Sequence, residues 1–402
     1  MSKIKIGEHI KIIPGFPFNS SLFNNDAEGL PLIRIRDLRD SKIETYYKGE
    51  FSKEYLIEEG DILIGMDGDF HIVRWKNKAK ALLNQRIMKV AQKDGAKINI
   101  DYFYYFLFPF LSDVWEKTTA TTVKHLSTYA ISEAEAKFPK FEIQRRIAQI
   151  LSTCDSVIEK TQAAIAKYQA IKQGMLHDLF TRGIDIQTGR LRPSYQDAPE
   201  WYKESKLGLI PREWEVKELG DIGEVRMCRR IFNFETSDQG DIPFFKIGTF
   251  GKQPDAYISE ELYNSYRQRF SFPQKGDILI SAAGTIGRTL IYNGAPSYYQ
   301  DSNIVWIDNN ENLISNKYLY QVFQIVEYKT EGGTIQRLYN SILKSALFPC
   351  PSKPEQRLIT ERLNSIDNKL QSEQSYLEKM KQLKKGLMED LLSGRKRVRI
   401  ET

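Results

Sequence analysis

Two long segments of the chain carry apolar residues at alternating intervals of four and three positions. Between Ile147 and Leu179, eight of the ten positions in this series are apolar, and the same holds between Ile359 and Leu391. A period of 3.5 residues sustained over this length is typical of coiled coils. The pattern predicts two long helices that pair through Ile147, Leu151, Ile158, Ile165, Met175, Leu179, Ile359, Leu363, Ile366, Leu370, Leu377, Leu387 and Leu391.

The ends of the two segments carry helix signals. Ser352 followed by Glu355 fits a capping box at the start of the second helix. Gly183 and Gly394 stand where a helix commonly ends. Lys172 and Lys384 interrupt the apolar series at equivalent places, so we expect them to fix the register of the pair; the alternative is that they face a partner subunit.

The two segments belong to a repeat that runs through the whole chain. Residues 171–183 (IKQGMLHDLFTRG) resemble residues 383–394 (LKKGLMEDLLSG), and Lys172 and Lys384 lie 212 positions apart. Further matches follow in the same order at nearly the same offset: Gly60-Asp61 with Gly276-Asp277, Thr122 to Leu126 with Thr334 to Leu338, Phe138-Pro139 with Phe348-Pro349, and Gln144-Arg145 with Gln356-Arg357. Several ordered matches indicate a duplication with two copies.

Each copy begins with a region of mixed character. Residues 62–64 and 278–280 are apolar runs entered through Gly-Asp, as buried strands often are, and frequent Gly, Pro and Asn residues predict many loops. The fold class is therefore two α/β (α+β) globular domains, each followed by a long helix. The boundaries are a first domain at 1–140, a helix at 141–182, an extended linker at 183–210, a second domain at 211–351, a helix at 352–394 and a basic tail at 395–402.

An isolated helix of this kind would leave its apolar positions in water, at about 1.5–3 kcal/mol for each large side chain. The helix of the other copy is the nearest surface that could bury these apolar positions. Because connections between elements are usually short, we expect the second helix to return antiparallel to the first within one chain. The expected result is an intramolecular antiparallel coiled coil with an internal pseudo-two-fold axis and one domain at each end.

Composition narrows the class of protein. The chain has 402 residues with 41% hydrophobic and 27% charged residues, which fits two or three globular domains. It has no apolar run of about 18 residues, so we expect no membrane span. Three widely spaced cysteines fit the reducing cytoplasm and no metal cluster. The net charge of +6 suits a nucleic-acid partner, although many proteins without one are mildly basic.

The repeated motifs resemble a known family. The Gly-Asp-Ile-Leu of each copy, the Thr-Val/Ile-x-x-Leu segment before Phe-Pro, the Gln-Arg near the start of each long helix and the Leu-x-x-Gly-Leu-x-x-Asp-Leu-Leu close are similar to those of specificity subunits of type I restriction–modification enzymes. The junction at 209–216 (LIPREWEV) resembles the usual entry to the second half. The first half starts without the Pro-x-x-Trp of that entry. The resemblance spans the whole chain.

The resemblance implies a function without catalysis by this chain. Each domain would read one half of a bipartite, asymmetric sequence in double-stranded DNA. The helices would set the spacer and dock two methyltransferase (M) subunits, and restriction/translocase (R) subunits would join the complex. The partners would use S-adenosylmethionine, ATP and magnesium, and this chain would bind no cofactor. The sequence has no phosphate-binding Gly-x-x-x-x-Gly-Lys-Ser/Thr loop, no His-Glu-x-x-His and no Gly-x-Ser-x-Gly.

DNA readout needs polar and cationic side chains on loops that face base edges and phosphates. For most candidates a structural turn or a solvated hairpin fits about as well, and for Leu126 and Leu338 a structural role fits better. Arg34 and Lys246 follow strand-like runs and suit the cover of a sheet edge. The candidates are Arg74, Lys76, Lys78, Thr122, Lys124 and His125 in the first domain and Arg229, Arg230, Arg288, Thr334, Gln336 and Arg337 in the second.

Two other functions fit the same pattern. The chain could be a coiled-coil adaptor whose two domains bind proteins. It could also be a nuclease that carries its own specificity. Binding to random DNA duplexes separates the adaptor from a DNA reader, and activity of the chain alone identifies a nuclease.

Overall fold

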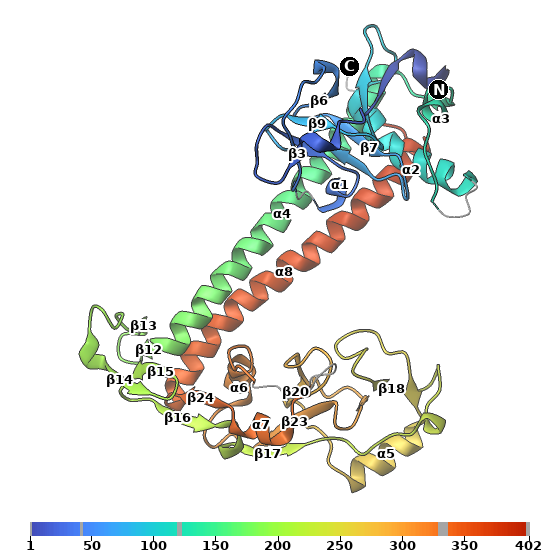
Figure 1. The fold of residues 1–402 in the computed structure, drawn as a ribbon. Helices are drawn as coiled ribbons and strands as arrows, with labels where there is room; N and C mark the ends of the chain where they lie inside the picture. Colours follow the sequence, from blue (N-terminus) through green and yellow to red (C-terminus); the bar gives the residue numbers. More distant parts are fainter. Residues whose placement is uncertain (1, 41–42, 119–122, 329–336, 399–402) are drawn as a thin grey trace. The chain divides into compact units, whose positions relative to one another are not determined.

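The computed structural model spans residues 1–402 and describes all of them except 1, 41–42, 119–122, 329–336 and 399–402 (Figure 1). The chain forms two compact units. Unit 1 contains residues 1–162 and 375–402, and unit 2 contains residues 163–374. Each unit thus holds one mixed domain and one half of each long helix. No helix in the described part of the chain has the length and apolar character needed to cross a membrane.

Unit 1 is built from two larger sheets, a two-stranded pair and several helices. The first sheet is antiparallel, with the order β2 (Ile10–Pro14), β10 (Ile87–Gln92), β7 (Ile62–Gly65) and β8 (Ile72–Arg74). The second has the order β3 (Phe23–Asn24), β5 (Tyr46–Tyr47), β4 (Leu30–Ile33), β9 (Ala81–Leu83) and β6 (Leu56–Ile57), and its β4–β9 pair is parallel. β1 (Ser2–Lys5) pairs with β11 (Glu135–Phe138). The helices are α1 (Asp37–Asp40), α2 (Ile100–Lys117) and α3 (Thr128–Ser132), with 3-10 turns at Ile6–Glu8, Ser20–Leu22 and Lys53–Tyr55.

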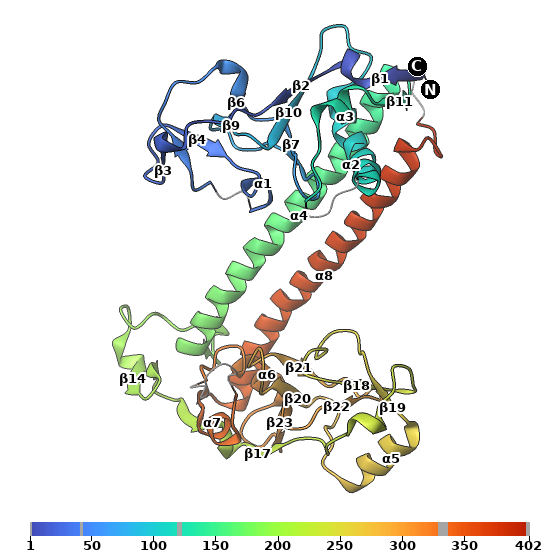
Figure 2. The ribbon, with the colours of Figure 1, turned by 45° about the vertical axis from the view of Figure 1, so that its right-hand side comes forward.

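Unit 2 repeats much of this plan. Its main antiparallel sheet has the order β17 (Gly223–Arg226), β23 (Ile304–Asn309), β20 (Ile278–Ser281) and β21 (Thr289–Ile291). A second sheet contains β19 (Tyr257–Ile258), β18 (Ile242–Phe245) and β22 (Tyr298–Tyr299), and β16 (Glu215–Glu218) pairs with β24 (Leu347–Cys350). Of its helices α5 (Glu260–Arg269), α6 (Asn316–Val322) and α7 (Asn340–Ser345), α6 contacts β20 and α7 contacts β17 (Figure 2). Two 3-10 turns lie at Leu219–Asp221 and Asn233–Glu235.

The repeat predicted from the sequence is therefore a structural repeat. The Gly-Asp-Ile-Leu motifs lead into β7 and β20, which are central strands with every residue buried. Burial of both faces explains why these segments read as continuous apolar runs instead of alternating ones. The predicted class, two mixed α/β domains each followed by a long helix, is confirmed.

The long helices are α4 (Phe141–Thr181) and α8 (Lys353–Leu392), and they run antiparallel in both units. In unit 1, Ile147 and Leu151 from the start of α4 share a hydrophobic cluster with Leu391 from the end of α8. In unit 2, Leu179 from the end of α4 shares a cluster with Ile359 near the start of α8. All thirteen residues expected to pair the helices are buried or half-buried. The intramolecular antiparallel pairing is confirmed.

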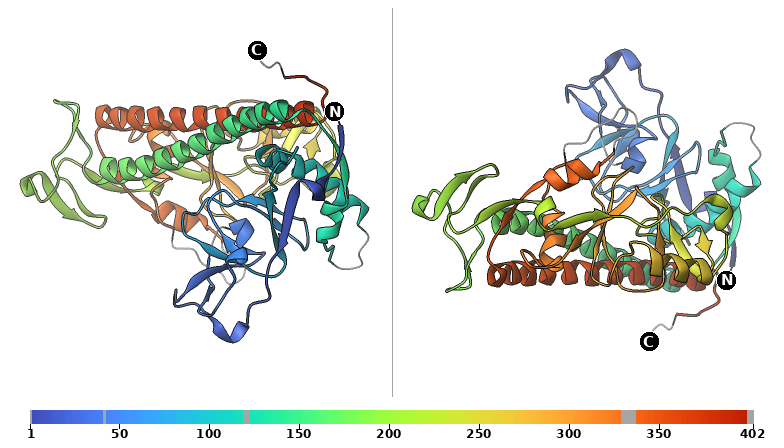
Figure 3. Two further views of the ribbon diagram at one scale, coloured as in Figure 1. Left: turned by 90° about the horizontal axis from the view of Figure 1, so that it is seen from above. Right: turned by 90° about the horizontal axis from the view of Figure 1, so that it is seen from below.

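The segment between α4 and β16 is folded, although the sequence analysis predicts an extended linker at 183–210. It contains two hairpins, β12 (Ile184–Asp185) with β13 (Arg190–Leu191) and β14 (Tyr202–Ser205) with β15 (Gly208–Pro211), separated by a 3-10 turn at Pro199–Trp201. Seen from above, β14 and β15 extend away from the end of α4 (Figure 3). The buried side chains of Ile184, Arg192 and Ile210 hold the segment against the rest of unit 2.

A buried group of charged and aromatic side chains joins this segment to the start of α8. The carboxylate of Glu355 accepts hydrogen bonds from Arg192 Nη2 (3.1 Å), Trp214 Nε1 (3.0 Å) and the backbone N–H of Ile184 (2.7 Å). Gly183 lies against the same group with φ of +67°, and a Cβ there would come within 2.3 Å of Glu355. The side chain of Glu355 therefore points to the linker. The sequence analysis instead expects it to complete a capping box with Ser352 at the start of α8.

Candidate nucleic-acid interface

In unit 1 a buried glutamine fastens the long helix to the rest of the domain. Gln144 is fully buried in the first turn of α4. Its Oε1 accepts a hydrogen bond from the backbone N–H of Asn99 (2.8 Å), and its Nε2 donates to the carbonyls of Lys97 (2.8 Å) and Pro139 (2.9 Å). Asn99 caps α2, because its side chain accepts from the backbone N–H of Tyr102. A single amide therefore fixes where α2 and α4 begin relative to each other.

Unit 2 uses the equivalent glutamine in the same way. The Oε1 of Gln356 accepts from the backbone N–H of Ser315 (3.2 Å), the residue that caps α6. Its Nε2 donates to the carbonyls of Leu313 and Pro351, each at 2.9 Å. The Gln-Arg motif near the start of each long helix thus has a structural cause. The shared hydrogen bonds hold both domains to their helices in the same manner.

The predicted reading segments lie against the loops that follow the central strands. In unit 1 the backbone N–H of Leu126 donates to the carbonyl of Met66 (2.7 Å). In unit 2 the N–H of Leu338 donates to the carbonyl of Ala282 (2.9 Å). Leu126 and Leu338 are both buried, as expected for residues with a structural role. Neighbouring bridges join Asp67 to His125 and Ala283 to Arg337, so the same backbone frame carries different side chains in the two units.

In unit 1, two of the candidate DNA-binding side chains belong to this frame. The Nδ1 of His125 lies 2.7 Å from the Oδ1 of Asp67. The ammonium group of Lys124 lies 3.6 Å from the ring centroid of Trp115 and donates to the Trp115 carbonyl. The indole N–H of Trp115 in turn donates to the carbonyl of Gly68 (2.7 Å). These contacts order the loop at 65–69, so its side chains are presented without a large further loss of conformational entropy.

The other candidates in unit 1 are mostly engaged within the protein. Arg74 on β8 forms an ion pair with Asp101 (2.8 Å) and packs over the ring of Tyr104. Lys76 forms an ion pair with Glu159 of α4. Lys78 is exposed, with no ion pair or side-chain hydrogen bond among the residues that the structure describes. Thr122 lies outside the described residues.

In unit 2 the candidates divide into structural and exposed residues. Arg288 donates to the carbonyls of Ile247 (2.8 Å) and Phe250 (3.4 Å), which ties the loop after β20 to the segment after β18. Arg230 forms an ion pair with Asp301 (2.9 Å). Arg229 and Arg337 are exposed. Thr334 and Gln336 lie outside the described residues.

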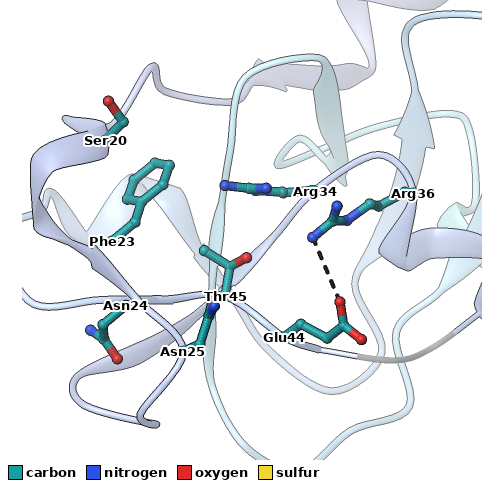
Figure 4. A pocket seen from close by; sticks show the side chains of 8 residues that line it. All are labelled: Ser20, Phe23, Asn24, Asn25, Arg34, Arg36, Glu44 and Thr45. Atoms are coloured by element: carbon teal, nitrogen blue, oxygen red, sulfur yellow. Dashed lines mark ion pairs between the residues drawn. The ribbon is translucent and has the colours of Figure 1, made fainter.

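An open cavity of about 470 Å³ in unit 1 contains two arginines that were not among the candidates (Figure 4). The guanidinium of Arg34 lies 5.5 Å from the ring centroid of Phe23, and Arg36 forms ion pairs with Asp37 (3.4 Å) and Glu44 (3.8 Å). The signal was present in the sequence, because Arg34 stands 212 positions before Lys246. Both residues directly follow strands, β4 and β18. The sequence analysis assigns Arg34 to the cover of a sheet edge, whereas here it lines a cavity.

The two lysines that interrupt the helix pattern each meet an aspartate of the opposite helix. In unit 2, Lys172 of α4 pairs with Asp367 of α8 at 2.5 Å. In unit 1, Lys384 of α8 pairs with Asp155 of α4 at 2.5 Å. The two aspartates are also 212 positions apart, so one type of ion pair occurs in both directions. Asp155 additionally accepts from the hydroxyl of Tyr105 (2.7 Å), and burial together with this bond raises the pKa of that phenol well above its usual value.

Comparison with known proteins agrees with this architecture. The family model "Type I restriction modification DNA specificity domain" matches residues 1–167 and again 211–382. A provisionally named type I restriction enzyme specificity subunit of Haemophilus influenzae is 56% identical over 169 residues, which are 42% of this chain and 44% of that protein, so the match spans less than half of it. The EcoBI specificity subunit of Escherichia coli is 28% identical over 381 residues, or 90% of this chain and 78% of that one.

A solved structure shares the fold. The crystal structure of the type I restriction–modification S subunit from M. genitalium aligns with a TM-score of 0.63 at 14% sequence identity, and the alignment covers 100% of this chain and 96% of that one. Because two copies of the family model together account for most of the sequence, the chain belongs to the family of type I restriction–modification DNA specificity proteins.

Proposed function

We propose that this chain is the DNA-recognition subunit of a type I restriction–modification complex and that it reads a bipartite, asymmetric target. The observation that carries the proposal is that the two domains share a frame and differ in the side chains on it. Gln144 and Gln356 make the same three hydrogen bonds. The neighbouring loops, GMDGD at 65–69 and SAAGTIGR at 281–288, have little in common. Equal placement with unequal chemistry suits two different half-sites.

The proposal gives the chain no catalytic role and no cofactor of its own. Methylation and cleavage would belong to methyltransferase and restriction/translocase partners that use S-adenosylmethionine, ATP and magnesium in the cytoplasm. In support of docking sites for a partner, each long helix has an exposed apolar residue at the same place in the repeat. Ile171 is 39% exposed and Leu383 is 49% exposed.

A glycine follows each of these residues by three positions, on the same face of the helix. Outside the adjoining stretch of its own helix, a Cβ at Gly174 or at Gly386 would meet no atom of the described residues within 4 Å. Glycine inside a helix costs about 1 kcal/mol relative to alanine, and no contact within the chain requires it at either position. A glycine lets another backbone approach closely. We therefore assign Ile171 with Gly174, and Leu383 with Gly386, as two equivalent docking faces, each for one methyltransferase subunit.

The function is tested by exposing the chain with its methyltransferase partner to a library of random duplexes and sequencing the bound fraction. The expected result is a motif of two specific blocks separated by a gap of fixed length. Recovery of no gapped motif contradicts the proposal and favours the adaptor. The chain alone should leave DNA uncut and unmodified; cleavage by the purified chain identifies the nuclease instead.

A further inference from the structure

Two arginines share one aromatic ring at the end of α5. The guanidinium carbons of Arg229 and Arg269 each lie 5.3 Å from the ring centroid of Phe270. Both side chains are exposed. Neither has an ion pair or a side-chain hydrogen bond among the residues that the structure describes. Stacking on a ring orients a guanidinium while leaving its N–H groups free to donate, so the two side chains form an ordered pair of cations without an anion.

A cavity of about 440 Å³ opens beside this pair, lined in part by Arg229, Arg230 and Phe270. The carboxylate of Asp301 also lines it, but Arg230 occupies that carboxylate at 2.9 Å. Cys228 also lines it, and burial raises the pKa of its thiol to about 12, so that thiol stays neutral. The local charge is therefore positive, which suits the cavity to binding an anion.

Exposed apolar side chains stand next to these cations. Phe234 is 85% exposed and Phe232 is 49% exposed, and their rings stack at 5.6 Å with an angle of 5° between the planes. Met227, which lines the cavity, is 46% exposed. A core role is excluded for rings this open to solvent. Exposed aromatic rings beside unpaired arginines are the combination that nucleic-acid-binding surfaces use against sugars, bases and phosphates.

We propose that this surface of unit 2 is a DNA contact in which Arg229 and Arg269 bind one backbone phosphate while Phe232 and Phe234 pack against the adjoining sugar or base step. The inference rests on the proposed function and adds residues to it, since Arg269, Phe232 and Phe234 are not candidates by sequence. A phosphate contact carries no sequence information, so the site fixes the position of unit 2 on the duplex and leaves the half-site unchanged.

The test measures binding of the assembled complex to its own target and to an unrelated duplex over a range of salt concentrations. Arg229→Gln combined with Arg269→Gln should weaken both by the same factor, about 10-fold or more, and reduce the slope of log K against log salt by about one. Lys203→Gln with Lys206→Gln, an equal loss of charge on the β14–β15 hairpin, should leave the slope unchanged. An unchanged slope in the arginine variant overturns the phosphate assignment.

The proposed contact of the two phenylalanine rings with DNA is tested by a separate measurement. Phe234→Ala should weaken DNA binding several-fold without a change in the salt slope, because it removes no charge. Its thermal midpoint should match the wild type, since the ring is exposed, and this excludes unfolding as the cause. Unaltered DNA binding by Phe234→Ala contradicts the aromatic contact. Variants that lose a protein subunit but still bind DNA would identify the surface as a protein-docking site instead. Failure of the wild-type complex to select any bipartite motif would instead contradict the proposed function itself.

Discussion

At the scale of single residues, Glu355 is the centre of a buried ion pair in unit 2. Its side chain and that of Arg192 are 1% and 3% exposed, and Trp214 and a backbone N–H complete its hydrogen bonds. A buried ion pair is costly to form, but removal of one partner leaves an uncompensated charge and costs about 3–5 kcal/mol. This group therefore holds the linker against the start of α8 only while all its members are present.

We expect Glu355→Gln to lower the free energy of unfolding by about 3 kcal/mol, because Arg192 would remain buried without its main counter-charge. Urea unfolding measures the change. Glu213→Gln is the matched control: Glu213 also pairs with Arg192, but its side chain is 76% exposed, so the loss should be below about 1 kcal/mol. Equal losses in the two variants would show that the buried group adds no more than a surface pair.

This group also marks a limit of local sequence reasoning. The Ser352 and Glu355 spacing predicts a capping box, and the chemistry of the motif is sound. Arg192 stands 163 positions before Glu355, and no local pattern reports a contact over that distance. The sequence predicts a helix end at Gly183 from its residue type and its place after the apolar series, which succeeds because the positive φ there is a local requirement.

At the scale of elements, the two lysine–aspartate pairs connect the long helices at equivalent positions. Lys172 and Asp367 are 16% and 28% exposed, which leaves their attraction only partly screened by solvent. We expect Lys172→Asp or Asp367→Lys alone to lower the stability of the helix pair by about 1–2 kcal/mol, because each single change sets like charges side by side. The double exchange should restore most of the loss, as measured by thermal unfolding in a double-mutant cycle. If the stability losses of the two single variants simply add in the double variant, the lysine–aspartate pair does not fix the register of the helices.

Replacing the glycines of the docking faces should change the stability of the helix and the binding of the partner in opposite directions. Gly174→Ala should stabilise α4 by about 0.5–1 kcal/mol through helix propensity, because the new Cβ has open space among the described residues outside its own stretch of helix. The same Cβ should weaken docking at that face. If the wild type binds two methyltransferase subunits as proposed, native mass spectrometry should then detect one, and the combination with Gly386→Ala should bind none.

Gln173→Ala is the control for this experiment, since it changes an exposed neighbour on another face of α4. It should leave two partners bound. Retention of both partners by the Gly174→Ala variant would exclude this face as the docking surface, whatever its effect on stability.

At the scale of the whole molecule, the sequence predicted the repeat, the long helices and their antiparallel pairing, because a sustained 3.5-residue period leaves few other ways to bury the apolar positions. Which side chains contact DNA stays a prediction, and the structure shows only what each candidate does within the protein. Arg74 and Arg288 were selected as basic loop residues, yet they serve the protein through Asp101 and the Ile247 carbonyl. Phe234 of the proposed surface is not a candidate by sequence, since an isolated phenylalanine suggests a core residue until its exposure is known.

The helices lead to a prediction about the target itself. If paired helices set the spacing between the half-sites, inserting seven residues in both should lengthen the gap, because one heptad keeps the apolar positions in phase. The sites are after Gln162 in α4 and after Gln374 in α8, where the two units meet along the chain. Seven residues add about 10 Å of helix, or about three base pairs of duplex.

Methylome sequencing of cells that express the chain with its partner should then report the original two blocks with a longer gap. A two-residue insertion in both helices is the control, because it rotates the apolar positions by about 200° to the opposite face and should abolish methylation instead of lengthening the gap. An unchanged gap in the heptad variant would mean that the helices do not measure the spacer. Altered blocks would mean that the domains depend on the helices for readout as well as for position.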